Sequence, residues 1–297
     1  MDKSKILKYA AAFLLIIGIA YFWNRLAPGE VDKDFGAPKP TESKSSSTID
    51  LTALEKVNGA NGVPSEVKEY EGFTVDFNKE NKTPNYVAWI LHGHETEGAS
   101  ARSNKFWTDT EIEGCPETRD YTRSGYDRGH MCPAGEQKWS ETAMHHSFVM
   151  ANICPQKHEL NTGAWKTLED KERVWAKRDS ALVIVAGPIY DSSDSETIGK
   201  NKVRVPSAFF KVLLAPYAEP MRAIGFVYPN MKCEGNMQAY SVSVDEVEKM
   251  TGMDFFSALP DDIENRVERT VSFKDWNSNK KKKDNNKKTE KANEYVE

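Results

Sequence analysis

Short apolar runs rich in strand-forming residues constrain the fold of this chain more than any other feature of its sequence. They occupy residues 73–77, 86–91, 147–151, 181–186, 208–214 and 223–228. The first run alternates apolar and polar residues, as a strand with one buried face does. The later runs are denser and rich in strand formers. Each run therefore predicts one β-strand.

Helical patterns are fewer and are unevenly spaced. We predict helices at about 163–177, after Ser243, and at 261–269. Glu246 follows Ser243 at the spacing of a capping box, which marks a helix N-terminus. Strands grouped among unevenly placed helices predict an α+β fold with a central antiparallel sheet and flanking helices, and not a regular alternation of strand and helix.

The overall charge limits how this chain could bind nucleic acid. Its 297 residues carry a formal net charge of −5, whereas a protein that coats nucleic acid is usually basic. Any such contact must therefore use a local basic site. The four cysteines form no C-x-x-C pair, which argues against a structural zinc site. They leave three disulfide pairings, or free thiols, open: Cys115, Cys132, Cys154 and Cys233.

The N-terminus has the pattern of a membrane-targeting segment. Three lysines precede an apolar run over residues 9–23, which is short for a span that needs about 20 apolar residues. Residues 18–20 could form a signal-cleavage site, whereas the aromatic residues 21–23 resemble an interfacial belt. We favour an uncleaved membrane anchor over residues 1–25, with the remaining chain exported. The alternative is secretion after signal cleavage.

Composition divides the rest of the chain into three parts. Residues 26–64 are rich in Pro, Gly, Ser, Lys and Glu, the composition of a flexible linker. Residues 276–297 form a lysine-rich tail that we expect to be solvated and disordered. A weak contact of this tail with phosphates is the alternative. The folded domain is therefore expected to span residues 65–275.

The segment Asp127-Arg128-Gly129-His130 contains the residue types of a hydrolytic site. Gly129 lets the backbone turn tightly beside the histidine. Arg128 has a fork of donors that suits phosphate oxygens. His130 is expected to titrate near neutral pH, as a base for water should. A histidine near an arginine is also common on ordinary surfaces, so this motif needs support from elsewhere.

Support comes from a helical pattern further along the chain. Asn161, Trp165, Glu169 and Arg173 are spaced by four, so a helix would place them along one face. The amide oxygen of Asn161 is a hard ligand suited to magnesium, which keeps most of its waters. Glu169 could hold one of these waters, and Arg173 could reach a phosphate. The alternative is a surface helix with a Glu169–Arg173 ion pair worth about 0.3–0.5 kcal/mol, which explains neither Asn161 nor Trp165.

Three motifs together resemble the DNA/RNA non-specific endonucleases, a family with a ββα-metal motif. They are Asp127-Arg128-Gly129-His130, Asn152-x-x-Pro155-Gln156 and Leu160-Asn161-x-Gly163-x-Trp165-x-x-Leu168-Glu169. The resemblance covers about residues 65–275. It implies that His130 is the general base, that Asn161 is the one direct protein ligand of the metal, and that Glu169 belongs to the outer shell. It also implies that three residues support the phosphate and the site geometry: Arg128, Asn152 and Arg173.

The expected activity is hydrolysis of phosphodiester bonds in DNA and RNA with little sequence specificity, because contacts to phosphate carry no sequence information. The expected cofactor is Mg²⁺, with Mn²⁺ possible, and the resemblance implies 5′-phosphate ends. Two rival functions are a nuclease fold that binds nucleic acid or a partner without cutting, and an exported zinc hydrolase acting on another phosphoester. The presence of His130 and Asn161 argues against the first. The second would need a closed set of zinc ligands that the sequence does not offer.

Overall fold

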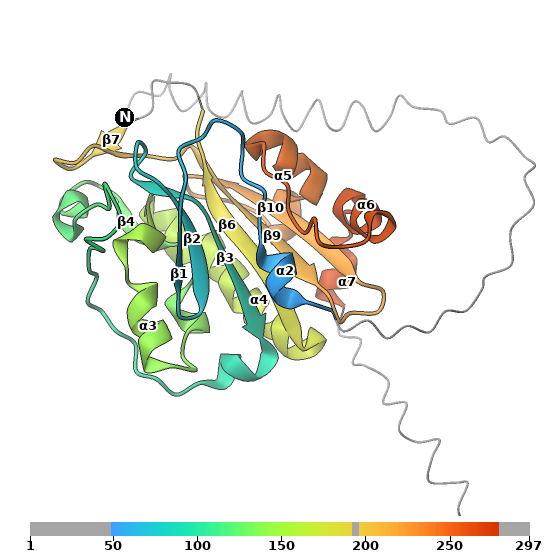
Figure 1. Ribbon diagram of the computed structural model, residues 1–297. Helices are drawn as coiled ribbons and strands as arrows, with labels where there is room; N and C mark the ends of the chain where they lie inside the picture. Colours follow the sequence, from blue (N-terminus) through green and yellow to red (C-terminus); the bar gives the residue numbers. More distant parts are fainter. Residues whose placement is uncertain (1–48, 192–195, 279–297) are drawn as a thin grey trace, which may run out of the picture. The chain divides into compact units, whose positions relative to one another are not determined.

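The structure, a computed structural model, describes residues 49–191 and 196–278. Its centre is a seven-stranded sheet in the order β1-β2-β3-β6-β9-β10-β11, in which neighbouring strands are antiparallel (Figure 1). The strands span Glu66–Tyr70 (β1), Phe73–Asn78 (β2), Thr83–His92 (β3), Ala181–Ile189 (β6), Ala208–Ala215 (β9), Arg222–Pro229 (β10) and Ser241–Val242 (β11). The α+β class and the antiparallel sheet predicted from the sequence are confirmed.

The position of each strand in the sheet explains its composition. Central strand β6 is buried continuously from Ala181 to Pro188, because helices cover both of its faces, and such strands have uninterrupted apolar sequences. In edge strand β1, half-buried and exposed residues alternate. Glu66 is half-buried and Glu69 is exposed. Edge strands with charged side chains resist pairing with other chains.

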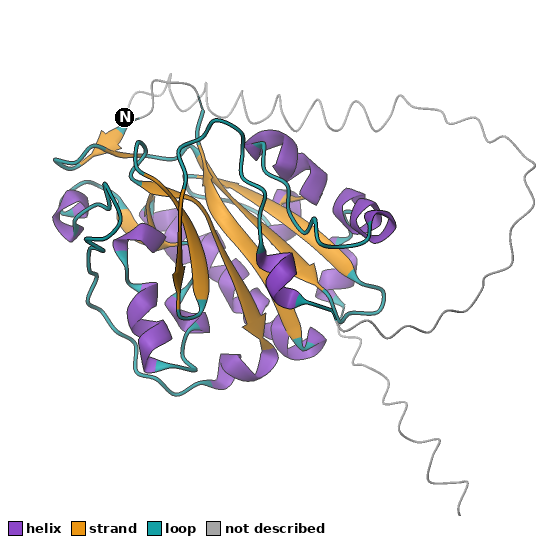
Figure 2. Cartoon of the chain, viewed as in Figure 1, coloured by secondary structure: helices purple, strands orange, loops and turns teal. Residues whose placement is uncertain are grey.

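Helices pack on both faces of the sheet (Figures 1 and 2). Helix α4, Lys166–Asp179, covers one face, where its Leu168 and Trp175 join Leu182 and Ile184 of β6 in the main hydrophobic core. Three further helices also pack against the sheet: α2 (Leu51–Glu55), α5 (Val244–Thr251) and α6 (Asp261–Arg269). Helices α5 and α6 contact β10.

Two neighbouring residues of β10 show that α4 and α5 lie on opposite faces. Phe226 stacks on Trp175 of α4, with ring centroids 6.3 Å apart. At Gly225, an added Cβ would lie 2.8 Å from Cγ2 of Val247 in α5. Successive residues of a strand point to opposite faces, so α5 packs on the face away from α4. The glycine permits this close approach.

A small hairpin outside the main sheet begins the strand–strand–helix order expected for a ββα motif. Strands β4, Asp127–His130, and β5, Ile153–Gln156, pair antiparallel. A π-helical turn, Leu160–Trp165, follows and leads directly into α4. The remaining described elements are α3 (Glu141–Ser147), α7 (Phe273–Asn277), β7 (Thr197–Ile198), β8 (Val203–Arg204) and short 3-10 turns. The ββα order therefore agrees with the resemblance.

One predicted strand is wrong, whereas the helices at 244–251 and 261–269 are confirmed with the Ser243 capping box. Residues 147–151 finish α3 and enter a 3-10 turn, and β5 begins only at Ile153. Helix α3 forms because the Ser140 side chain accepts hydrogen bonds from its first backbone N–H groups. Short buried apolar runs do not distinguish strand from helix.

Of the possibilities left open for the four cysteines, the structure has free thiols at all four positions.

The folded domain begins earlier and ends later than the predicted limits of 65 and 275. Leu54 in α2, within the predicted linker, is buried, and Asn58 forms a β-bridge with Asp254. Trp276 in α7, within the predicted tail, packs its ring against Trp175 at 5.0 Å. At both ends of the domain, the buried apolar residues are too few to form a periodic pattern in the sequence, so composition placed these segments outside the fold.

The predicted anchor at 1–25, the linker up to residue 48 and the tail beyond 278 lie outside the described residues. Within residues 49–191 and 196–278, no helix has the length and apolar character needed to cross a bilayer.

Candidate active site

Two close contacts fix the elements of the ββα motif against one another. Gly129 in β4 pairs with Cys154 in β5, and an added Cβ on Gly129 would lie 2.1 Å from Oε1 of Gln156. Only glycine leaves room for this side chain. The indole Nε1 of Trp165 donates a hydrogen bond to the backbone oxygen of His130 at 3.1 Å. This buried bond ties the start of α4 to the end of β4.

His130, the candidate base, lies between two aromatic rings. Its ring centroid is 5.0 Å from that of Phe148, edge to face, and 5.5 Å from that of Phe106. The side chain is buried, and its Nε2 has no hydrogen-bond partner among the described residues. Burial, and next the positive charge of Arg102, lower the pKa of His130 to about 3. The imidazole is therefore neutral at neutral pH, and the expectation that it titrates near pH 7 is wrong.

Arg128 lies on the same face of β4 as His130, two residues away. Its guanidinium carbon is 5.4 Å from the Phe106 ring centroid and 5.8 Å from that of Tyr121. Its Nη2 donates to the backbone oxygen of Thr118 at 2.6 Å, whereas its buried Nε has no partner among the described residues. One donor therefore positions the guanidinium, and an unpaired buried donor favours binding of an external acceptor.

Asn161 is oriented by the first residue of β4. Its Nδ2 donates to Oδ2 of Asp127 at 2.9 Å, and Nδ1 of His158 lies 2.9 Å from the same oxygen. Because the amide nitrogen points to the carboxylate, the amide oxygen points away from it. An oriented amide oxygen beside a carboxylate suits a hard, hydrated cation such as Mg²⁺. The residues present therefore fit the metal that the resemblance implies.

Asn152 was expected to support the phosphate and the site geometry, and its side chain contacts the backbone near His130. Its side chain is fully buried. Its Oδ1 accepts a hydrogen bond from the N–H of Cys132 at 2.9 Å, and its Nδ2 donates to the backbone oxygens of Cys132 and Ser147 at 2.8 Å each. Asn152 thus holds the segment after His130 and is a positioning residue.

Glu169 and Arg173 do not form the ion pair of the surface-helix alternative. Arg173 pairs with Asp170, and its Nη1 lies 3.8 Å from Oε1 of Glu136. Glu169 is half-buried, and burial raises its pKa to about 7 while the nearby positive charge of Lys211 opposes the rise. A carboxylate in this state can be ionised by a bound cation. Arg173 is positioned chiefly by acidic neighbours, with its side chain 24% exposed.

A buried lysine that the sequence analysis missed lies beneath α4. Lys211 on β9 places its Nζ 2.9 Å from Oε2 of Glu172, and neither side chain is exposed. The same Nζ is 4.7 Å from the Trp165 ring centroid and 5.4 Å from that of Trp89. The aromatic faces and the carboxylate together replace the hydration that the ammonium group loses.

Two further glutamates surround this lysine. Glu136 is buried and accepts a hydrogen bond from Nε1 of Trp89 at 2.8 Å. Burial opposes the charged form of Lys211, but the carboxylates of Glu172, Glu169 and Glu136 prevail and raise its pKa. The lysine therefore stays charged. We call this group the lysine-centred cluster: Glu136, Glu169, Glu172, Arg173 and Lys211.

The structure thus brings His130, the candidate base, and Arg128 together on Phe106, and Asn161 against Asp127. Asp127 had no role among the functions predicted from the sequence, although it opens the first motif. Lys211 had a visible signal, since it is the one charged residue of an otherwise apolar run. Phe106 and Arg102 lie in a loop without periodicity, so only the tertiary structure reveals their proximity to His130.

Comparisons with known proteins agree with this geometry. The model of the DNA/RNA non-specific endonuclease family matches residues 52–262. Nuclease EXOG, mitochondrial, of Danio rerio is 32% identical over 231 residues, which cover 70% of this chain and 66% of that protein. The mitochondrial nuclease of Saccharomyces cerevisiae is 33% identical over 231 residues, which cover 68% of this chain and 69% of that protein.

A solved structure shows the same fold. A chain in the crystal structure of the EndoG/EndoGI complex, which concerns the mechanism of EndoG inhibition, is 27% identical with a TM-score of 0.63, and the match covers 72% of this chain and 95% of that chain. This chain spans 66% of the Danio rerio relative and 60% of the Xenopus laevis nuclease EXOG. Because the family model matches most of its length and includes the whole ββα motif, the chain belongs to the DNA/RNA non-specific endonuclease family.

Proposed function

We propose that this protein is a metal-dependent endonuclease that hydrolyses phosphodiester bonds of DNA and RNA with little sequence specificity and leaves 5′-phosphate ends. One observation carries the proposal: the ββα motif presents a buried, neutral histidine with an unpartnered Nε2, and an asparagine whose amide nitrogen is held by Asp127. Family membership supports the same activity. The substrate would be bound through its phosphates, which are common to DNA and RNA.

His130 would accept a proton from the attacking water at its unpartnered Nε2. Its low pKa makes it a weak base in the empty site. A bound phosphodiester brings negative charge close to the ring and favours the protonated imidazole. Substrate binding would therefore strengthen the base where the reaction needs it. Arg128, held against Phe106, would offset charge that develops on the phosphate.

Asn161 would hold Mg²⁺, or Mn²⁺, through its amide oxygen, and Glu169 would accept hydrogen bonds from the waters of that ion. When bound, the cation supplies charge neutralisation at the phosphate and at the departing 3′ oxygen. Asp127 would keep the amide of Asn161 in the orientation that ligation requires. Arg173, held by Asp170 and near Glu136, would approach the phosphate from α4.

The proposal is tested by cleavage of plasmid DNA and of RNA by the His130→Ala variant, with and without a chelator. Loss of a general base is expected to slow cleavage by about 10²–10⁴-fold, and chelation should stop the parent protein. His94→Ala is the matched control, because His94 is exposed on a turn after β3, and it should cleave like the parent. Near-parental turnover by His130→Ala would refute the assigned base.

We further propose that the domain is exported and tethered to the membrane by the N-terminal segment. Three lysines before an apolar run favour retention of the N-terminus in the cytoplasm. Protease added to intact spheroplasts should then release the domain. Full protection of the domain, with a cytoplasmic protein equally protected and an exported protein digested in the same sample, would exclude this orientation.

A further inference from the structure

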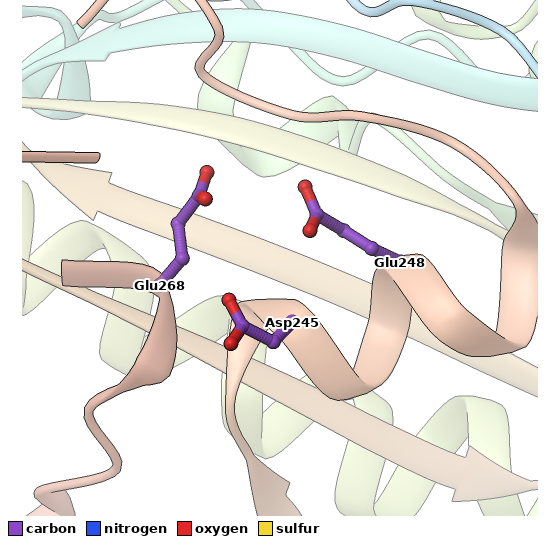
Figure 3. Close-up of side chains that lie close together, drawn as sticks. All are labelled: Asp245, Glu248 and Glu268. Atoms are coloured by element: carbon purple, nitrogen blue, oxygen red, sulfur yellow. The ribbon is translucent and has the colours of Figure 1, made fainter. Parts of the chain in front are cut away.

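A group of three carboxylates lies between α5 and α6 (Figure 3). Asp245 and Glu248 belong to α5, three residues apart and so on one helix face, and Glu268 belongs to α6. One ligand oxygen from each side chain lies within 4.8 Å of the others. Figure 3 shows that Glu268 and Glu248 point toward one another, with the carboxylate of Asp245 beside them. We call these three residues the acidic cluster.

The acidic cluster contains a buried oxygen without a partner. Glu268 is 5% exposed, and its Oε1 accepts no hydrogen bond from any described residue. Glu248 is fixed in place, since its Oε1 accepts a hydrogen bond from the N–H of Phe255 at 3.0 Å. None of the ion pairs within residues 49–191 and 196–278 involves a member of this cluster. A buried, unpaired carboxylate is unfavourable unless it gains a counter-charge.

We propose that Asp245, Glu248 and Glu268 bind one divalent cation, Ca²⁺, that links α5 to α6 on the sheet face away from the nuclease site. Three converging carboxylates suit Ca²⁺, which takes six to eight oxygen ligands in flexible geometry. Mg²⁺ prefers one or two carboxylates and several waters in strict octahedral geometry. Asp245 and Glu248 are only half-buried, so water can complete the coordination.

The nearby charges favour a cation at this position. Glu264 and Asp254 add two more carboxylates around Glu268. Their field attracts positive ions. The rival explanation is a proton in place of the cation: burial, then Glu248 and the other nearby carboxylates, raise the pKa of Glu268 to about 9. The two explanations differ in one measurable respect, because only the first requires uptake of a metal ion.

The test is Ca²⁺ binding by the full-length chain, measured by equilibrium dialysis and by the thermal midpoint. Both measurements use an Asn161→Ala background, so that the proposed nuclease metal site cannot contribute. We expect one Ca²⁺ per chain, with a dissociation constant of about 10⁻³ M or lower, as in extracellular calcium modules, and a higher thermal midpoint with Ca²⁺. Glu268→Gln should weaken binding about tenfold or more, since affinity follows the number of charged ligands.

Asp262→Asn is the control, because it removes a carboxylate from the same helix at an exposed position outside the acidic cluster. It should bind one Ca²⁺ and keep the rise in thermal midpoint. Asp245→Asn, at a half-buried position, provides a second variant should Glu268→Gln fold poorly, and it should also weaken binding. Absence of Ca²⁺ uptake by the background protein would overturn the proposal in favour of the proton. Equal binding by the Glu268→Gln, Asp245→Asn and Asp262→Asn variants would overturn it as well.

Discussion

The lysine-centred cluster and the acidic cluster both place carboxylates in the protein interior, on opposite faces of one sheet, but only the first contains its own cations. Glu172 is paired with the buried Lys211, and Glu136 lies near Arg173. In the acidic cluster, Glu268 faces two more carboxylates and gains no cation from the described residues. The first cluster can therefore be stable without any ligand, whereas the second depends on what the solution supplies.

This difference has a consequence for the nuclease site. Lys211 and Arg173 supply counter-charges to the lysine-centred cluster from within the chain, so the proposed response of Glu169 to Mg²⁺ would not require a rearrangement of the core. In the acidic cluster, the missing counter-charge means that binding of an ion and packing of α5 against α6 are coupled. Ligands that bind only the folded state stabilise it in proportion to their concentration.

The largest expected effect comes from removal of the buried cation. Lys211→Met should lower the free energy of unfolding by about 3–5 kcal/mol, because it leaves Glu172 buried and uncompensated. Denaturant unfolding measures this change, with the exposed Lys200→Met as control. Added Ca²⁺ should not restore the loss. The double variant Lys211→Met/Glu172→Gln should be more stable than Lys211→Met alone. If it is not, the pair is not the source of the effect.

The next effect, smaller for each pH unit, is on the pH dependence of stability. The pKa of Glu268 is raised from its ordinary value of 4.5 to about 9 by burial and by the surrounding carboxylates. The unfolded chain therefore releases this proton near pH 4.5, whereas the folded chain retains it until about pH 9. Stability should fall as pH rises between these values, by at most about 1.4 kcal/mol per pH unit. The groups that face Glu268 are Asp245, Glu248, Asp254 and Glu264.

Unfolding free energies measured in chelator from pH 5 to 9 should show this slope, and Glu268→Gln should reduce it. Added Ca²⁺ should reduce it too, since a cation then replaces the proton. The Lys211–Glu172 pair provides the contrast, because its charges are compensated within the chain. If the free energy of unfolding falls with pH equally steeply in the parent protein and in Glu268→Gln, then Glu268 is not the source of the pH dependence and the two clusters do not differ in this respect.

Glu169→Gln should have the smallest effect on stability but a clear effect on activity. This change keeps the shape of the side chain and should reduce activity or Mg²⁺ affinity by about 10–100-fold, as changes beside a metal site do. The thermal midpoint should stay the same or rise at pH above about 7, because a half-buried carboxylate with a raised pKa is lost. Glu159→Gln, at an exposed position before the π-helical turn, is the control. An unchanged Mg²⁺ response would remove Glu169 from the proposed site.

Much of the architecture was predictable because it depends on local patterns. Five of the six apolar runs are strands, since a buried strand requires an apolar sequence wherever it lies in the sheet. The helices after Ser243 and at 261–269 were predictable from a capping signal and from charge patterning at their ends. The conformation of residues 147–151 was not predictable, because it depends on residues outside the run. Ser140 caps helix α3, and Asn152 donates a hydrogen bond to the backbone oxygen of Ser147.

The order of the ββα motif and the positions of His130, Arg128 and Asn161 were readable from the sequence, because these residues lie in short segments with a recognisable spacing. The burial, charge state and hydrogen-bond partners of these residues depend on how the chain packs. The low pKa of His130 arises from burial and from Arg102, which lies 28 positions earlier in the numbering. The two carboxylate clusters likewise join residues from separate elements. Burial and long-range charge depend on which segments pack together, and local sequence patterns do not contain that information.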